Sequence, residues 1–115
     1  MTIIAQGEIY CRQIDALPEG LAEFTERNEA GDWIISHSES GNHHLLDGGA
    51  TVMERTKDVP DGMRILYAIV DAPAQLRQDA AGNAHEAHDI APGIFEMRIA
   101  REYDPFMQQA RRVAD

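Results

Sequence analysis

Apolar residues in this chain fall into short runs in which apolar and polar positions often alternate, and the runs end at Gly, Pro or Asp. In residues 94–103, Phe95, Met97, Ile99 and Tyr103 share one side of a period-two pattern, which is typical of a β-strand. Residues 63–70 are apolar on both sides and predict a central strand. The predicted strands cover residues 7–14, 33–37, 43–46, 50–54, 63–70, 74–77 and 94–103. About seven short strands predict an all-β fold, a small barrel or sandwich.

Two segments favour helical structure. Leu21 and Phe24 are spaced as in a single helical turn, and an irregular crossover is the alternative for this segment. At the C-terminus, Asp104 and Pro105 resemble an N-cap followed by a first helical position. An apolar stripe follows at Phe106, Ala110 and Val113. We therefore expect one β domain over residues 1–115, with residues 104–115 forming a short C-terminal helix or arm.

Composition narrows the function. Twenty acidic and ten basic residues give a formal charge of −10, which argues against direct nucleic-acid binding because that needs a basic surface. There is one cysteine, so no intrachain disulfide can form. The N-terminus lacks the pattern of a signal peptide, and no apolar run is long enough to span a membrane. These features predict a protein that stays in the cytoplasm where it is made, or in a particle assembled there.

All five histidines occur in two clusters, at 37–44 and 85–88. Histidine is the commonest metal ligand in proteins. Adjacent strand residues point to opposite faces, so His43 and His44 cannot both enter one site. The alternatives are two solvated loops, or one site for a divalent ion such as zinc or iron if the clusters meet. The candidate ligands are His37, Glu39, His44, His85 and His88.

Other reactive residues have simpler explanations. Cys11 lies within a predicted strand and is expected to be a small core residue. Trp33 and Tyr67 are expected to be core aromatic residues. The serines near the first histidine cluster lack the nucleophile elbow of a hydrolase. The metal-binding pattern of cupins is not matched either, because no histidine follows Pro92 and Gly93.

A set of short motifs along nearly the whole chain resembles a group of small proteins of bacteriophages and bacterial genomes. The resemblance implies a protein of viral rather than metabolic function, and it implies no particular biochemical activity. The residues that carry it are His37, Glu39, Gly41, His44, Tyr67, Val70, Pro73, Leu76, His88, Ile90, Pro92, Gly93, Phe95, Glu96, Arg101, Glu102, Tyr103, Pro105, Arg112, Val113 and Asp115.

These observations lead us to expect a structural virion protein, most specifically a capsid decoration (cement) protein on the capsid surface. Its partners would be the major capsid protein and its own copies in a homo-oligomer, without membrane or direct nucleic-acid contact. Both chain ends are expected to be arms that bind a partner, either by adding a strand to its sheet or by docking into a groove. A small metal-dependent enzyme or ligand-binding barrel is the main alternative, and a cytosolic regulator is another. The expected partner-binding residues are Ile3, Ile4, Phe106, Ala110, Arg111, Arg112 and Val113.

Overall fold

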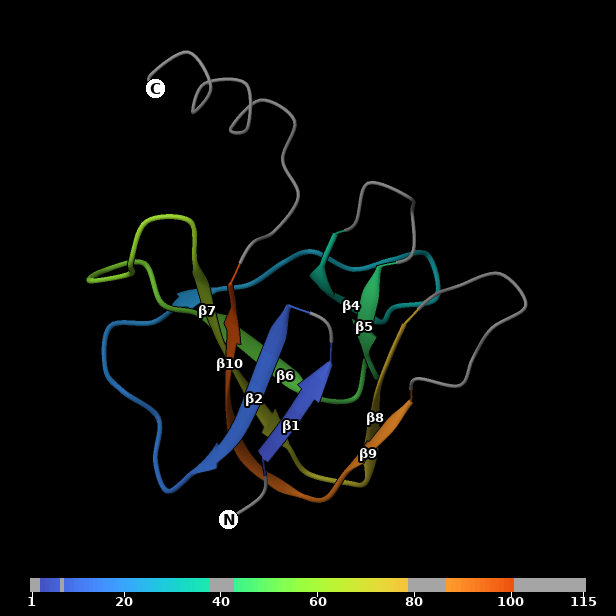
Figure 1. Cartoon of the computed structure of the whole chain (residues 1–115). Coiled ribbons are helices and arrows are strands. Elements are labelled where there is room, and N and C mark those ends of the chain that lie inside the picture. Colours follow the sequence, from blue (N-terminus) through green and yellow to red (C-terminus); the bar gives the residue numbers. More distant parts are fainter. Residues whose placement is uncertain (1–2, 7, 38–42, 79–86, 101–115) are drawn as a thin grey trace.

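The computed structural model describes residues 3–6, 8–37, 43–78 and 87–100. They form an all-β domain of two antiparallel sheets, which confirms the predicted fold class (Figure 1). The six-stranded sheet has the order β1-β2-β10-β7-β6-β3, and the four-stranded sheet has the order β4-β5-β8-β9. The strands are β1 (Ile3–Gln6), β2 (Ile9–Ile14), β3 (Ala22–Glu23), β4 (Trp33–Ser36), β5 (His44–Leu46), β6 (Thr51–Glu54), β7 (Arg64–Val70), β8 (Ala74–Gln78), β9 (His88–Ile90) and β10 (Gly93–Ile99).

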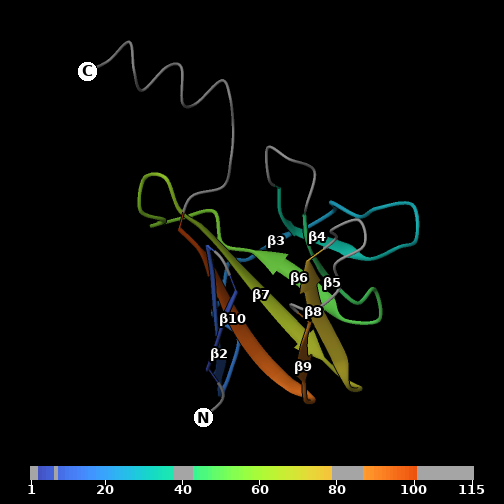
Figure 2. The same cartoon turned by 45° about the vertical axis from the view of Figure 1, so that its right-hand side comes forward.

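Three chain segments run through both sheets. The segment from β7 to β8 pairs with β6 and β5 on one side and with β10 and β9 on the other. Short linkers at 47–50, 71–73 and 91–92 separate the two halves of each segment. The Gly and Pro residues expected to end strands there therefore mark bends between sheets rather than hairpin turns. Figure 2 shows these three segments passing from one sheet into the other.

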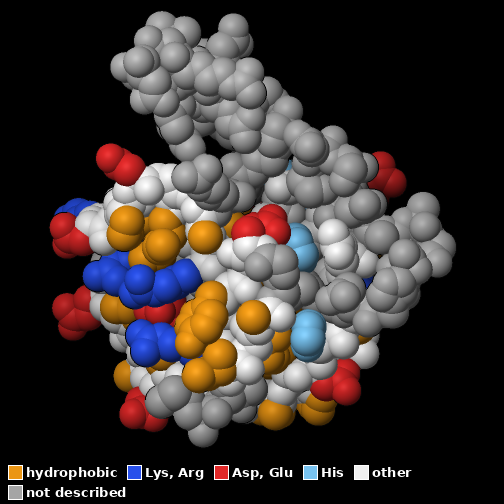
Figure 3. Space-filling view, viewed as in Figure 1, with side chains coloured by type: hydrophobic (Ala, Val, Ile, Leu, Met, Phe, Trp, Pro, Cys, Tyr) orange, Lys and Arg blue, Asp and Glu red, His pale blue; other side chains and the backbone are white. Residues whose placement is uncertain are grey.

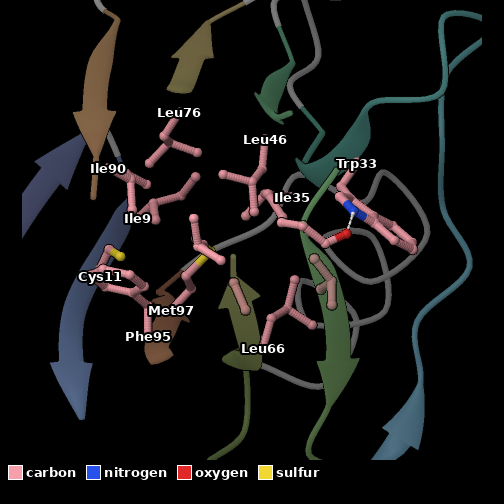
Figure 4. Packing of buried hydrophobic residues seen from close by; sticks show 14 of the residues in the cluster. Ile9, Cys11, Trp33, Ile35, Leu46, Leu66, Leu76, Ile90, Phe95 and Met97 are labelled. Carbon is pink, nitrogen blue, oxygen red and sulfur yellow. Dashed lines mark hydrogen bonds between the residues drawn. The ribbon is translucent and has the colours of Figure 1, made fainter. Parts of the chain in front are cut away.

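The predicted centre of the domain is correct. β7 and β10 are the two middle strands of the six-stranded sheet, and their seven residues pair from Gly93 with Val70 to Ile99 with Arg64. Every other side chain of these strands enters the core between the sheets, among them Leu66, Phe95 and Met97. Figure 4 shows this packing, with Ile35, Leu46 and Leu76 contributed by the other sheet. Burial of these apolar side chains is the main force that holds the two sheets together.

Three strands were missed in the prediction, which is why the structure has more than about seven. The apolar segment expected to be a free N-terminal arm is β1, which pairs with β2, and Ile4 packs against the core. The helical turn expected at Leu21 and Phe24 is wrong, because Ala22 and Glu23 pair with β6 instead. β9 is a strand at residues for which the sequence predicts a loop. Each of these strands is short and lacks an extended alternating pattern, so its conformation depends on its neighbour.

The strands predicted at residues 33–37 and 43–46 correspond to β4 and β5, which pair antiparallel with a register irregularity between Ile34 and Ser36. The last expected strand ends at Ile99. Ala100, which was predicted to continue the strand, is outside it, and residues 101–103 of the prediction lie outside the described residues. Residues 38–42 and the predicted C-terminal helix at 104–115 also lie outside them. Within the described part of the chain, no helix is long and apolar enough to cross a membrane.

Candidate functional site

The outer face of the six-stranded sheet, the side turned away from the other sheet, carries a polar cluster among apolar side chains. The strand register places Tyr67 opposite Glu96, and Glu96 opposite Arg12. These three side chains therefore form one row across β7, β10 and β2. Arg98 lies on the same face two residues beyond Glu96, because alternate strand residues share a face. The row is the geometric centre of the candidate site.

Glu96 holds this cluster together. Its Oε1 accepts hydrogen bonds from Nε of Arg12 at 3.0 Å and from Nε of Arg98 at 2.9 Å. The hydroxyl of Tyr67 donates to Oε2 at 3.2 Å. Glu96 is only 5% exposed, whereas the arginine side chains are 43% and 40% exposed. A buried carboxylate thus anchors two cationic side chains at the surface.

The pKa shifts follow from this arrangement. Burial alone would raise the pKa of Glu96, but the hydrogen bonds from Arg98 and Arg12 outweigh it and the pKa lies below its ordinary value. Burial and the neighbouring carboxylate of Glu96 raise the pKa of Tyr67, while Arg55 acts in the opposite direction. The hydrogen bond to Glu96 raises the pKa of Arg12. The charged forms of Glu96 and Arg12 therefore stabilise each other.

Apolar side chains surround the cluster. Tyr10 and Ile3 share its face and are 44% and 54% exposed. On the β1 and β2 side of the molecule, Figure 3 shows basic side chains beside hydrophobic ones, with acidic atoms between them. Tyr67, expected to be a core aromatic residue, is buried but lies on this outer face and is outside the cluster of the main core.

The first histidine cluster divides between two carboxylates. His44 lies 3.1 Å from Glu8 through Nε2, and the hydroxyl of Ser36 donates to the same carboxylate at 2.7 Å. Both Ser36 and His44 are buried. Since the carboxylate stands between serine and histidine, this is not the order of a hydrolase triad, in which histidine stands between the other two. Glu8 instead ties the β1–β2 end of one sheet to β4 and β5 of the other.

His37 belongs to a different network. Its Nε2 lies 3.0 Å from Oε1 of Glu26, whose other oxygen accepts from Arg64 at 2.6 Å. Burial would raise the pKa of Glu26, but Arg64 and His37 lower it below the ordinary value. The rings of His37 and His43 meet edge to face, with centroids 4.9 Å apart.

The predicted metal ligands are therefore only partly placed. His37 and His44 contact different carboxylates, and His88 in β9 lies opposite Leu76 in β8. Glu39 and His85 lie outside the described residues. Among the residues that are described, no group of three or more His, Cys, Asp or Glu side chains is arranged to hold a metal ion. A metal site that includes Glu39 and His85 stays a prediction.

The predicted partner-binding residues are also only partly placed. Ile3 is exposed on the outer face, and Ile4 packs against the core. The five predicted at the C-terminus lie outside the described residues: Phe106, Ala110, Arg111, Arg112 and Val113. Cys11 is buried in the core as expected, and burial raises the pKa of its thiol to about 12.

The sequence reasoning missed the Arg12–Glu96–Arg98 cluster. Glu96 and Arg98 did carry a signal, since they occupy alternating positions opposite the core residues of their strand. Arg12 is 84 positions from Glu96, so only the strand register brings it there.

The fold and site define a small two-sheet β domain with a mixed apolar and cationic sheet face. A family model described as a domain of unknown function, DUF8820, matches residues 5–100. Because this match covers most of the chain, the protein belongs to that family. Neither the curated proteins nor the solved structures contain a match to it.

Proposed function

We propose that this protein is a binding protein of a phage particle, a capsid decoration protein that attaches to the major capsid protein through the outer face of its six-stranded sheet. One observation carries the proposal. Tyr10 and Ile3, the large apolar side chains exposed in the described part of the chain, lie on this one face. Both border the arginine pair. Exposed aromatic and apolar groups beside arginine are typical of the centre of protein interfaces.

The viral setting of the proposal rests on the motifs shared with small phage proteins. His37, Glu39 and His44 begin this pattern, and Glu96 belongs to it. The acidic composition supports binding to protein rather than to the packaged nucleic acid. A decoration protein needs a stable fold and an adhesive surface, and the outer face supplies such a surface.

The test is binding to capsid shells assembled without this protein. Tyr10→Ser should reduce co-sedimentation with the shells by at least about fivefold, since interface aromatic residues often contribute more than 1 kcal/mol. Val59→Ser, a change in the loop after β6, is the matched control and should bind within about twofold. Equal binding by both variants, or no binding by the unchanged protein, would contradict the proposal.

A further inference from the structure

Within the described part of the chain, the two arginines on the outer face have N–H donors that bind no acceptor. A guanidinium carries five N–H donors, of which Nε–H is one. Arg12 and Arg98 each use Nε to bind Glu96. Among the described residues, no acceptor is hydrogen-bonded to the Nη atoms of either side chain. Each arginine therefore offers the two-nitrogen end of its guanidinium, the part that binds a carboxylate or phosphate through two parallel hydrogen bonds.

The local charge favours an anion. Two guanidinium groups face one carboxylate in the cluster, and a third, that of Arg55, interacts with Tyr67. The whole chain, in contrast, has a formal charge of −10. This face is thus a cationic region on an acidic protein, and an incoming anion would be attracted to it.

The arginines are also held in place before any ligand arrives. Glu96 is almost fully buried and is itself bound by Tyr67. Because Nε of each arginine is fixed by this carboxylate, fewer side-chain rotamers remain to be ordered on binding. Preorganisation of this kind increases affinity without adding a contact.

We propose that Arg12 and Arg98 form a binding site for the carboxylate of an Asp or Glu side chain in an acidic, partly apolar segment of a partner protein. Tyr10 and Ile3 would contact the apolar side chains next to that carboxylate. This inference rests on the proposed function, because it names the chemistry by which the same face recognises its partner.

Two features favour an acidic protein segment over other occupants. A nucleic-acid backbone would be repelled by the net charge of the chain and would gain little from the apolar surround. A second copy docking face to face would bring two arginine pairs together, and like charges in an interface are unfavourable. An acidic and apolar segment complements both components of the surface.

The probe is a synthetic acetylated peptide that alternates glutamate with leucine, titrated into the full-length protein and followed by amide NMR shifts. We expect shifts at β2 and β10. Arg98→Gln should weaken binding about tenfold, as expected for loss of one charge-assisted pair. Arg98→Lys, which keeps the charge but loses the planar fork, should weaken it about threefold. Lys57→Gln removes one positive charge from a loop and should bind within about twofold.

The outcomes are distinguishable. Equal binding of a peptide with glutamine in place of glutamate would overturn the carboxylate site. Tighter binding of inorganic phosphate or of a short oligonucleotide would overturn the choice of ligand. If Arg98→Gln does not fold, Arg98→Lys decides, and unchanged affinity in that variant overturns the proposal. If the peptide binds but capsid shells do not, only the proposed function fails. If shell binding depends on Tyr10 but not on Arg98, only this inference fails.

Discussion

At the bend between the sheets, one arginine binds two carboxylates, whereas on the outer face two arginines bind the same carboxylate. Arg77 in β8 is ion-paired with Asp32 and Asp47. Each aspartate also accepts a backbone N–H, from Gly48 at 3.1 Å and from Gln75 at 2.8 Å. Both oxygens of both aspartates are therefore occupied, and both terminal nitrogens of Arg77 bind a carboxylate of the chain.

The Arg12–Glu96–Arg98 cluster differs from this network in the hydrogen bonds of its arginines. Its carboxylate is fully used, but the outer nitrogens of its arginines have no hydrogen-bond acceptor among the described residues. The difference shows that an ion pair by itself does not identify a binding site. What matters is whether hydrogen-bond donors remain unused on an exposed side of the network. A network without such donors stabilises the fold, whereas a network with them can bind a ligand.

A third feature near the Arg77 network supports the same distinction. A shallow hollow of about 590 Å³ lies at the bend between the sheets, lined in part by Asp47, Asp89 and Pro92. Asp47 is already bound to Arg77, and Asp89 accepts a hydrogen bond from Gln75 at 3.0 Å. Its charged groups are thus committed to the fold, and the hollow carries no comparable excess of donors.

A substitution in the core provides a reference for the stability changes expected in the two arginine networks. Leu66 in β7 is fully buried between the sheets. Leu66→Ala should lower the free energy of unfolding by about 2–5 kcal/mol, because it removes buried contacts and leaves a cavity. Urea denaturation followed by Trp33 fluorescence measures the change. Val59→Ala in the loop is the control, and a loss of less than about 1 kcal/mol in the core variant would contradict the assigned centre of the core.

The two arginine networks should differ in their contribution to stability. Arg77→Leu should cost about 1.5–3 kcal/mol, because it leaves the carboxylates of Asp32 and Asp47 without their shared cation. Arg98→Leu should cost less than about 1 kcal/mol, because Arg12 and Tyr67 still bind Glu96 and the lost side chain is 40% exposed, so that its ion pair is screened by solvent. The same urea experiment gives both values. Equal costs would show that the outer cluster is as essential to the fold as the network at the bend.

The smallest predicted effect is on the stability of the folded protein at acid pH. The pKa of Glu96 is lowered in the folded protein, so its stabilisation is complete above the ordinary carboxyl pKa and is lost as the pH falls through the folded value. Glu96→Gln should therefore reduce the loss of stability in the acid range below about pH 4.5. The measurement is the urea midpoint as a function of pH. Glu29→Gln, at an exposed position, is the control, and identical pH profiles for the two variants would refute the assignment.

The sequence predicted the parts of the fold that have long regular patterns. The period-two alternation in β10 and the fully apolar β7 were enough to identify them as central strands. It failed for β1, β3 and β9, which contain four, two and three residues. The local sequence of these three segments does not distinguish a strand from a loop or an arm, and pairing with a neighbour decides their conformation.

The candidate site was harder to predict from local sequence patterns than the fold. Histidine composition directed attention to His37 and His44, which lie within ion-pair distance of two different carboxylates, Glu26 and Glu8. The outer-face cluster instead combines residues that are unremarkable in sequence. Glu96 looks like an ordinary polar position of an alternating strand, and nothing near Arg12 indicates that it will lie opposite Glu96.

Local sequence by itself therefore determined the all-β class, the central strands and the burial of Cys11, because alternation and apolar character act within a few residues. The tertiary structure alone decided the bends that carry three segments through both sheets. It also decided the register that sets Arg12, Glu96 and Tyr67 in one row. The physical reason is that register arises from pairing between distant segments, and a shift by one residue would turn each of these side chains to the opposite face.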